Sequence, residues 1–421
     1  MSQGTITRFA KNTGILFISS LFISIANLGV SFSIGNVCGS VALGIYAFTV
    51  ALTRVLLSAS EMGIGTHLIK RISREQENAN KCVKLIISMR LLLLPIIVTI
   101  VVISSMLVGV ENLPAVILIA TSLAFLSIGT THEALLTAKE RFPHIGAARI
   151  LYTILLVTGI LLWFAAEGDL QSISILLLAV ALINLFVYWL FGLKLEGFWP
   201  GWVWDPIYLY DVIKKSLPIG ISAMLAIATL KTPILVLTIS KGVEPAGRYA
   251  AVEMFVVAMT MIQLAVSRVS FPALSRNFNN NPKSFRKWLL LSNIFLAFVG
   301  IIFALVFTLF GGQIVSIFFP QRTFGSLGDL AAIMGWASPM ILLIHHNIYI
   351  FAAANLEVYN MKLMILGFVA TALFVSLLAP AYGIIGVGVG IVTSRFLFLL
   401  IVLYVGYRNK VHLGTSMLTA N

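Results

Sequence analysis

The chain of 421 residues is 59% hydrophobic and only 10% charged, and its mean hydropathy is +1.02. Soluble domains carry about 25% charged residues, so this composition excludes a soluble globular protein. The formal net charge of +13 does not indicate a nucleic-acid partner, because the basic residues stand mostly at the ends of apolar runs. The composition predicts an all-α polytopic membrane protein.

Apolar runs recur from end to end, and each is long enough to cross a hydrocarbon core of about 30 Å as a helix of about 20 residues. Turn signals such as Gly35-Asn36 and Glu167-Gly168-Asp169 separate the runs and divide the chain into about twelve spans. The predicted spans are residues 12–35, 42–68, 83–108, 113–137, 144–166, 171–193, 216–240, 246–272, 288–311, 327–353, 360–380 and 384–407.

The basic residues at the loop ends predict the orientation. Nineteen Lys and Arg residues lie at one set of loop ends, and only Lys241, Arg248 and Arg322 lie at the alternate set. This excess predicts a multi-pass protein of the cytoplasmic (inner) membrane with both termini cytoplasmic. The nineteen are Arg8, Lys11, Lys70, Arg71, Arg74, Lys81, Lys84, Lys139, Arg141, Lys194, Lys214, Lys215, Arg276, Lys283, Arg286, Lys287, Lys362, Arg408 and Lys410.

An internal repeat organises the spans. Gly44-x-Tyr46-Ala47 returns as Gly247-x-Tyr249-Ala250 at an offset of 203, and Ser73-Arg74 returns as Ser275-Arg276 at 202. The offset relates the first span to the seventh, so each half holds six spans. An even number of spans gives both halves the same orientation. The repeat predicts two six-helix lobes related by a pseudo-two-fold axis along the membrane normal.

The lobes are predicted over residues 1–193 and 216–421, the second ending in a short cytoplasmic tail. Between them, residues 194–215 read KLEGFWPGWVWDPIYLYDVIKK and hold three of the seven tryptophans, with lysines at the flanks. Aromatic and basic residues together favour the headgroup layer of a membrane. We interpret this stretch as a cytoplasmic linker with an interfacial segment.

No enzyme constellation stands out. His345 and His346 are adjacent, which is not the helical spacing that puts two metal ligands on one face. The chain has no phosphate-binding GxxxxGK[ST] motif, and Gly386-Val-Gly388-Val-Gly390 lies inside an apolar span, where close helix packing explains it. We expect no enzyme activity, no metal site and no cofactor.

Charges inside the predicted spans are the remaining candidates for chemistry. Each costs on the order of 3 kcal/mol at the bilayer centre, so such groups face protein, water or a ligand. One interpretation is that those near span ends reach the cytoplasmic interface. Arg54 and Lys231 lie deeper and are predicted to line a cavity. The nine charges are Arg54, Arg90, Arg149, Lys231, Arg268, Arg395, Glu61, Glu133 and Glu253.

Two of the acids have alternative interpretations. Glu61 would be a partner for another basic residue or a protonatable coupling group, and Glu253 would pair with Lys231. An internal structural salt bridge is an equal alternative for either. Six cations against three acids favour an anionic substrate, because the planar arginine side chain binds phosphate through two parallel hydrogen bonds.

Several motifs resemble polysaccharide and O-antigen flippases of the Wzx type, in the multidrug/oligosaccharidyl-lipid/polysaccharide exporter superfamily. The second span, with Gly44-x-Tyr46-Ala47 and then EMGIGTHLIKRISR (61–74), carries the first resemblance. TAKERF (137–142) before the fifth span, KKSLP (214–218) opening the seventh, and the eighth-span stretch 247–276 carry the others.

The resemblance implies a V-shaped transporter whose first, second, seventh and eighth spans line a central cavity. It implies alternating-access flipping of a polyprenyl-pyrophosphate-linked oligosaccharide, such as an O-antigen repeat unit. Arg54, Lys231 and Arg268 are the positions implied for the anionic headgroup, and Asn27 is a candidate sugar contact. Many relatives carry an acid in the seventh span where this chain has Lys231. Membrane lipid and the glycan polymerase machinery are the implied partners.

Two other functions compete with this one. A cation-coupled multidrug exporter of the same superfamily would need carboxylates to dominate its cavity, whereas here the bases do. A membrane-embedded glycan polymerase or acyltransferase would commonly need a long outer loop that bears catalytic residues. Every predicted outer loop of this chain is short.

Overall fold

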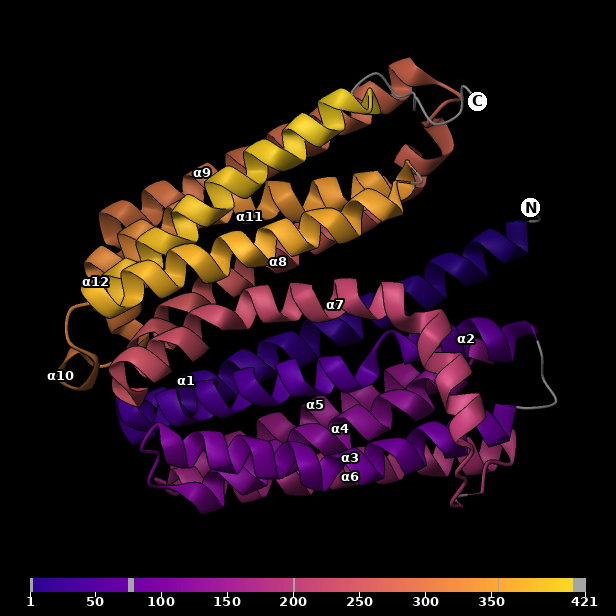
Figure 1. The fold of residues 1–421 in the computed structure, drawn as a ribbon, viewed down its shortest axis with the longest axis horizontal. Coiled ribbons are helices and arrows are strands. Elements are labelled where there is room, and N and C mark those ends of the chain that lie inside the picture. The colour runs from indigo at the N-terminus through magenta and orange to yellow at the C-terminus, as the bar shows by residue number, and fades with distance from the viewer. Residues whose placement is uncertain (1–2, 75–78, 200, 355, 412–421) are drawn as a thin grey trace. The chain divides into compact units, whose positions relative to one another are not determined.

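The computed structural model describes residues 3–74, 79–199, 201–354 and 356–411. All regular elements in these residues are helices (Figure 1), which confirms the predicted class. They are α1 (Gln3–Glu61), α2 (Ile64–Arg74), α3 (Ala79–Leu107), α4 (Leu113–Ala138), α5 (Phe142–Ala165), α6 (Leu170–Glu196), α7 (Pro206–Lys241), α8 (Val243–Asn277), α9 (Pro282–Phe318), α10 (Gln321–Phe324), α11 (Gly328–Ala353) and α12 (Glu357–Arg408).

Ten helices in the described residues are long and apolar enough to cross a membrane. Two of them are too long for one crossing, because the apolar parts of α1 and α12 extend over 48 and 50 residues, or about 70–75 Å at the α-helical rise. Each is interrupted by a glycine with positive φ, Gly39 (φ 83°) in α1 and Gly383 (φ 57°) in α12. Counting each half as a span gives the predicted twelve.

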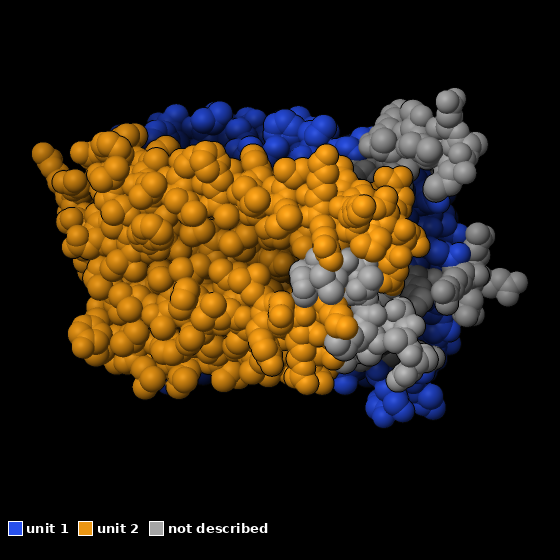
Figure 2. All heavy atoms as spheres, turned by 90° about the horizontal axis from the view of Figure 1, so that it is seen from above, with its two compact units in different colours: residues 1–227 blue, residues 228–421 orange. Residues whose placement is uncertain are grey.

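The chain forms two compact units, residues 1–227 and 228–421, coloured blue and orange in Figure 2. Unit 1 contains both halves of α1 and the spans α3, α4, α5 and α6. Unit 2 contains most of the α7 span, the spans α8, α9 and α11, and both halves of α12. The lobe boundaries drawn from the sequence, 1–193, 194–215 and 216–421, stay a prediction.

The backbone repeats at the offset found in the sequence. Gly39 has φ 83° and ψ −173°, and Gly242, 203 residues later, has φ 90° and ψ −179° at the start of α8. Both precede the G-x-Y-A element, and both occupy a region of φ/ψ space that glycine alone adopts readily. The same break therefore separates the first two spans of each half.

The second span ends earlier than the sequence pattern predicts. The helix ends at Glu61, because Met62 (φ 37°) and Gly63 (φ 71°) turn the chain, and α2 follows as a separate amphipathic helix that is not a candidate span. Gly220 of α7 lies directly against this turn. A Cβ there would collide with the backbone of Met62, so a side chain is excluded.

Each unit has a central helix. In unit 1, α4 packs against α1, α3, α5 and α6, and its buried residues extend from Ala115 to Leu136. In unit 2, α11 packs against α8, α9 and α12. His346 of α11 is fully buried, with Nδ1 2.8 Å from Ser267 Oγ and Nε2 2.7 Å from Ser292 Oγ. These bonds tie α11 to α8 and α9 inside unit 2.

Candidate functional site

A polar cavity of about 350 Å³ lies inside unit 1, among α1, α4, α5 and α6. Its lining residues follow helical spacing, which places them on one face of each helix. The residues are Ser20, Ser24 and Asn27 from the first half of α1, Tyr46, Val50 and Arg54 from the second half, Ser122, Thr130 and Glu133 from α4, Arg149 and Tyr152 from α5, and Asn184 and Tyr188 from α6, with Ile23, Ile119, Leu123, Leu126 and Leu177.

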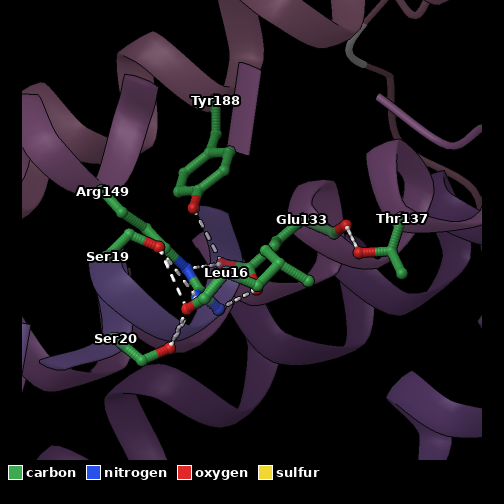
Figure 3. A network of polar contacts seen from close by, with 7 residues as sticks. All are labelled: Leu16, Ser19, Ser20, Glu133, Thr137, Arg149 and Tyr188. Carbon is green, nitrogen blue, oxygen red and sulfur yellow. Dashed lines mark hydrogen bonds and ion pairs between the residues drawn. The ribbon is translucent and has the colours of Figure 1, made fainter. Parts of the chain in front are cut away.

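A hydrogen-bonded network around Glu133 and Arg149 forms one wall of this cavity (Figure 3). Arg149 donates from Nη2 to Glu133 Oε1 at 2.6 Å and from Nε to Oε2 at 3.4 Å, a two-pronged ion pair. The Tyr188 hydroxyl donates to Glu133 Oε2 at 2.8 Å, and Arg149 Nη1 donates to Ser20 Oγ at 2.8 Å. The carboxylate is therefore neutralised and its oxygens are occupied.

The network joins α1, α4, α5 and α6. Arg149 Nη1 also reaches the Leu16 carbonyl oxygen at 3.3 Å, and Thr137 donates to the Glu133 carbonyl oxygen at 2.7 Å. An uncompensated arginine at this depth would be costly, and the carboxylate and the α1 acceptors together remove that cost. Arg149 is thus an interior residue of unit 1, not one that reaches out to the interface.

Arg54 is different from Arg149. Its side chain is exposed toward the cavity that it lines, and it makes no hydrogen bond or ion pair with any described residue. Its charge interacts over a longer range with the hydroxyl groups of Tyr46 and Tyr152. With Arg149 matched by Glu133, Arg54 gives the cavity one uncompensated positive charge. Asn27 lines the same cavity from the first half of α1, whereas Arg54 belongs to the second half.

Glu61 belongs to a second network beside the cavity. Arg90, only 6% exposed, donates from Nη2 to Glu61 Oε1 at 3.4 Å and from Nη1 to Thr130 Oγ1 at 2.8 Å and to the Ser127 carbonyl oxygen. The Ser127 hydroxyl donates to Glu61 Oε1 at 3.2 Å. Glu61 therefore forms an ion pair with Arg90, and its role as a coupling group or as a charge-pair partner stays a prediction. Thr130 links this network to the cavity wall.

The other predicted site residues belong to unit 2. Glu253 of α8 accepts from the Tyr249 hydroxyl at 3.4 Å and interacts electrostatically with Lys231 of α7, without an ion-pair contact. Lys231 and Arg268 are both partly buried. That they share a cavity with Arg54 stays a prediction, as do the roles assigned to all six residues.

The network of Glu133, Arg149 and Tyr188 was not predicted. The sequence marks Glu133 and Arg149 as intramembrane charges but gives neither a partner. The helical spacing of Ser20, Ser24 and Asn27, and of Asn184 and Tyr188, was the signal available. Polar residues that recur on one face of an apolar helix indicate a polar interior.

The polar groups of this cavity are mostly hydroxyl, amide and guanidinium groups. The described residues contain no group of three or more His, Cys, Asp or Glu side chains that could hold a metal ion. The one cavity carboxylate is engaged by Arg149 and Tyr188. Hydroxyl and amide groups surround a single free guanidinium, an arrangement suited to a polar ligand that carries negative charge.

Twelve spans among the described residues, with a polar cavity inside unit 1, define a multi-pass membrane protein with a polar interior site. A structure described as lipid II flippase MurJ, inward closed conformation, aligns with a TM-score of 0.76 at 14% identity, covering 93% of this chain and 87% of that chain. A second structure is described as the inward-facing conformation of a multidrug resistance MATE family transporter of the MOP superfamily. It aligns with a TM-score of 0.70 at 16% identity, covering 94% of this chain and 95% of that chain. A MOP superfamily transporter from Pyrococcus furiosus aligns with a TM-score of 0.66 at 14% identity, covering 96% of each chain.

These likenesses show that the chain has the fold of MOP superfamily transporters. The family described as polysaccharide biosynthesis protein matches residues 9–278, and the chain belongs to this family. No curated protein matches the chain.

Proposed function

We propose that the protein is a flippase that moves a polyprenyl-pyrophosphate-linked oligosaccharide, an O-antigen or other surface-polysaccharide repeat unit, across the cytoplasmic membrane by alternating access. Membership of the polysaccharide biosynthesis family supports the substrate class. The fold shared with a lipid II flippase supports the transport of a lipid-linked sugar. Both termini are proposed to be cytoplasmic, and the glycan polymerase machinery is the proposed downstream partner.

The observation that carries this proposal is the free guanidinium of Arg54 in a cavity of hydroxyl and amide groups. Arg54 would bind the pyrophosphate, and Asn27 would donate to a sugar hydroxyl. Lys231 and Arg268 are proposed as further cations for the same headgroup. Tyr46 and Tyr152 offer the aromatic faces and hydroxyl groups that saccharides commonly contact.

The alternative, a cation-coupled multidrug exporter, finds support in the fold shared with multidrug transporters. An organic cation would need a free carboxylate in the cavity. Glu133 is bound by Arg149 at 2.6 Å and by Tyr188 at 2.8 Å, so its charge is already matched. The remaining charge, on Arg54, would repel a cation. The cavity therefore favours the anionic substrate.

The test replaces Arg54 by Gln and by Lys in a strain that lacks the native protein, and measures export of the surface glycan together with the amount of protein in the membrane. We expect R54Q to lower export at least tenfold, because a charge-assisted hydrogen bond worth about 1.5–3 kcal/mol is lost. R54K should retain part of the activity. Arg322→Gln, at an exposed position of α10, is the matched control and should export normally.

Unchanged export by R54Q at normal protein levels would refute the assignment of Arg54. The alternative is separated by drug susceptibility. If the protein protects cells from cationic drugs and R54Q leaves that protection intact, the exporter function replaces the flippase.

A further inference from the structure

A second cavity of unit 1, which we call the lateral groove, lies between α3, α4, α6 and the residues Phe198, Gly201 and Trp202. Its volume is about 610 Å³, within the range of ligand sites. It shares no lining residue with the cavity that contains Arg54. Leu91, Leu182, Phe186 and Trp202 on its rim are 41–59% exposed, so the groove is open at the side of the unit.

One end of the groove carries hydrogen-bond donors that have no acceptor. Lys84 of α3 is partly buried and makes no hydrogen bond or ion pair with any described residue. The indole Nε1 of Trp189 on α6 is buried and also has no partner. Unsatisfied buried polar atoms are rare in proteins, and each calls for an explanation such as an absent ligand.

His132 of α4 is the third such residue. It is 3% exposed and lines the groove, yet neither ring nitrogen makes a hydrogen bond of acceptable geometry. The carbonyl oxygen of Ile128, one turn earlier, interacts with the ring but forms no hydrogen bond of acceptable geometry with it. A neutral imidazole has a single N–H, and no described acceptor holds it, so it is available to a group inside the groove.

The other end of the groove is apolar. Leu91 lies seven residues beyond Lys84 on α3, and Leu182 lies seven residues before Trp189 on α6, each about 10 Å away along its helix. Ile128 is one turn from His132 in the same direction. The groove therefore has donors at one end and hydrocarbon at the other, which matches an amphiphile.

The donor end lies at the level of the headgroup layer. Lys84 is near the start of α3, whereas His132 and Trp189 are near the ends of α4 and α6, and the exposed tryptophans 199, 202 and 204 follow directly. Exposed tryptophans of this kind gather at the membrane–water interface. A basic pocket between helices at this depth suits an anionic lipid headgroup.

We infer that the lateral groove binds an anionic glycerophospholipid of the membrane. One acyl chain lies along Leu91, Leu182 and Phe186. The phosphate accepts hydrogen bonds from Lys84, His132 and Trp189. His132 and Trp189 are the direct sequence neighbours of Glu133 and Tyr188, whose side chains form the network on the cavity side of the same helices. The bound lipid thus supports the helices that separate the groove from the cavity.

The test is mass spectrometry of the intact, delipidated protein after addition of phosphatidylglycerol, phosphatidylcholine or diacylglycerol with identical acyl chains. We expect one phosphatidylglycerol to be retained at least tenfold more tightly than either of the others. Lys84→Gln, which removes the charge, and Leu91→Trp, which fills the apolar end, should each lower this binding at least tenfold. Lys194→Gln, at an exposed position of α6 outside the groove, is the control and should bind normally.

Three results would overturn the inference: equal binding by the Lys84→Gln and wild-type proteins, equal binding of phosphatidylcholine, or stoichiometric displacement of the lipid by a polyprenyl pyrophosphate. The last would assign the groove to the transported molecule. Both variants change partly exposed positions, so folding does not confound them, and His132→Phe adds a third measurement.

Discussion

The ion pair between Glu133 and Arg149 offers a quantitative test of how unit 1 is held together. We expect Glu133→Gln and Arg149→Gln each to lower the stability of the protein, and the double variant to lose much less than the sum of the two. The side chains of Arg149 and Glu133 are 19% and 24% exposed, so the pair lies between a surface pair and a fully buried one.

The magnitude follows from this intermediate burial. Surface pairs contribute about 0–1 kcal/mol, and breaking a buried pair by removing one partner costs about 3–5 kcal/mol. A coupling energy of about 2 kcal/mol is therefore expected between Glu133 and Arg149. For a unit of this size, 1 kcal/mol corresponds to about 2–4 °C. Each single variant should then unfold about 5 °C below the wild type in a thermal melt in detergent.

The more exposed pair of Lys81 and Asp205, at 2.9 Å with side chains 51% and 31% exposed, is the matched control. Its double-mutant cycle should give a smaller coupling energy, because solvent screens an exposed pair. A coupling energy below about 0.5 kcal/mol for Glu133 and Arg149 would refute the structural role of their network.

Two further predictions follow from local geometry. Gly39→Ala should destabilise the protein by about 1–2 kcal/mol, because φ is 83° at this position. Gly29 lies in a regular part of α1 with open space around it, so Gly29→Ala is the control and should not destabilise the protein. Thermal melts of the two variants measure the difference. Equal melting temperatures for the Gly39→Ala and Gly29→Ala variants would contradict the positive φ angle at Gly39. The Tyr208 backbone N–H and Lys81 lower the pKa of the Asp205 carboxyl, so its stabilising effect is present above about pH 4 and is lost as the pH falls through the lowered pKa. Asp205→Asn should therefore melt below the wild type at pH 6 and approach it near pH 2; a constant gap would contradict this.

Hydropathy predicts the spans well, because every apolar run long enough to cross the bilayer must be a helix there. It could not predict where the second span ends. The residues after Glu61 continue an apolar pattern, and only the positive φ angles of Met62 and Gly63 show that the chain turns. The amphipathic face of α2 then packs on the unit instead of crossing the membrane.

The sequence predicts which charged residues lie inside the spans, but not which of them form ion pairs. The sequence places Arg54 deeper in its span than Arg149, which lies nearer a span end, but it gives neither residue a partner. Three helices must pack before Glu133 and Tyr188 reach Arg149, and these contacts are separated by 16 to 55 residues in the chain. Only the packed structure shows that Arg54 is left without such partners.

The net positive charge of the cavity comes from Arg54, because the charge of Arg149 is matched by Glu133. Were Arg149 replaced by a neutral residue, Glu133 would become an unmatched acid and the net charge of the cavity would fall from positive to zero. Replacing Arg54 as well would make it negative. Two point mutations would thus invert the sign of the cavity's net charge, a short evolutionary distance between a positively and a negatively charged chamber on one scaffold.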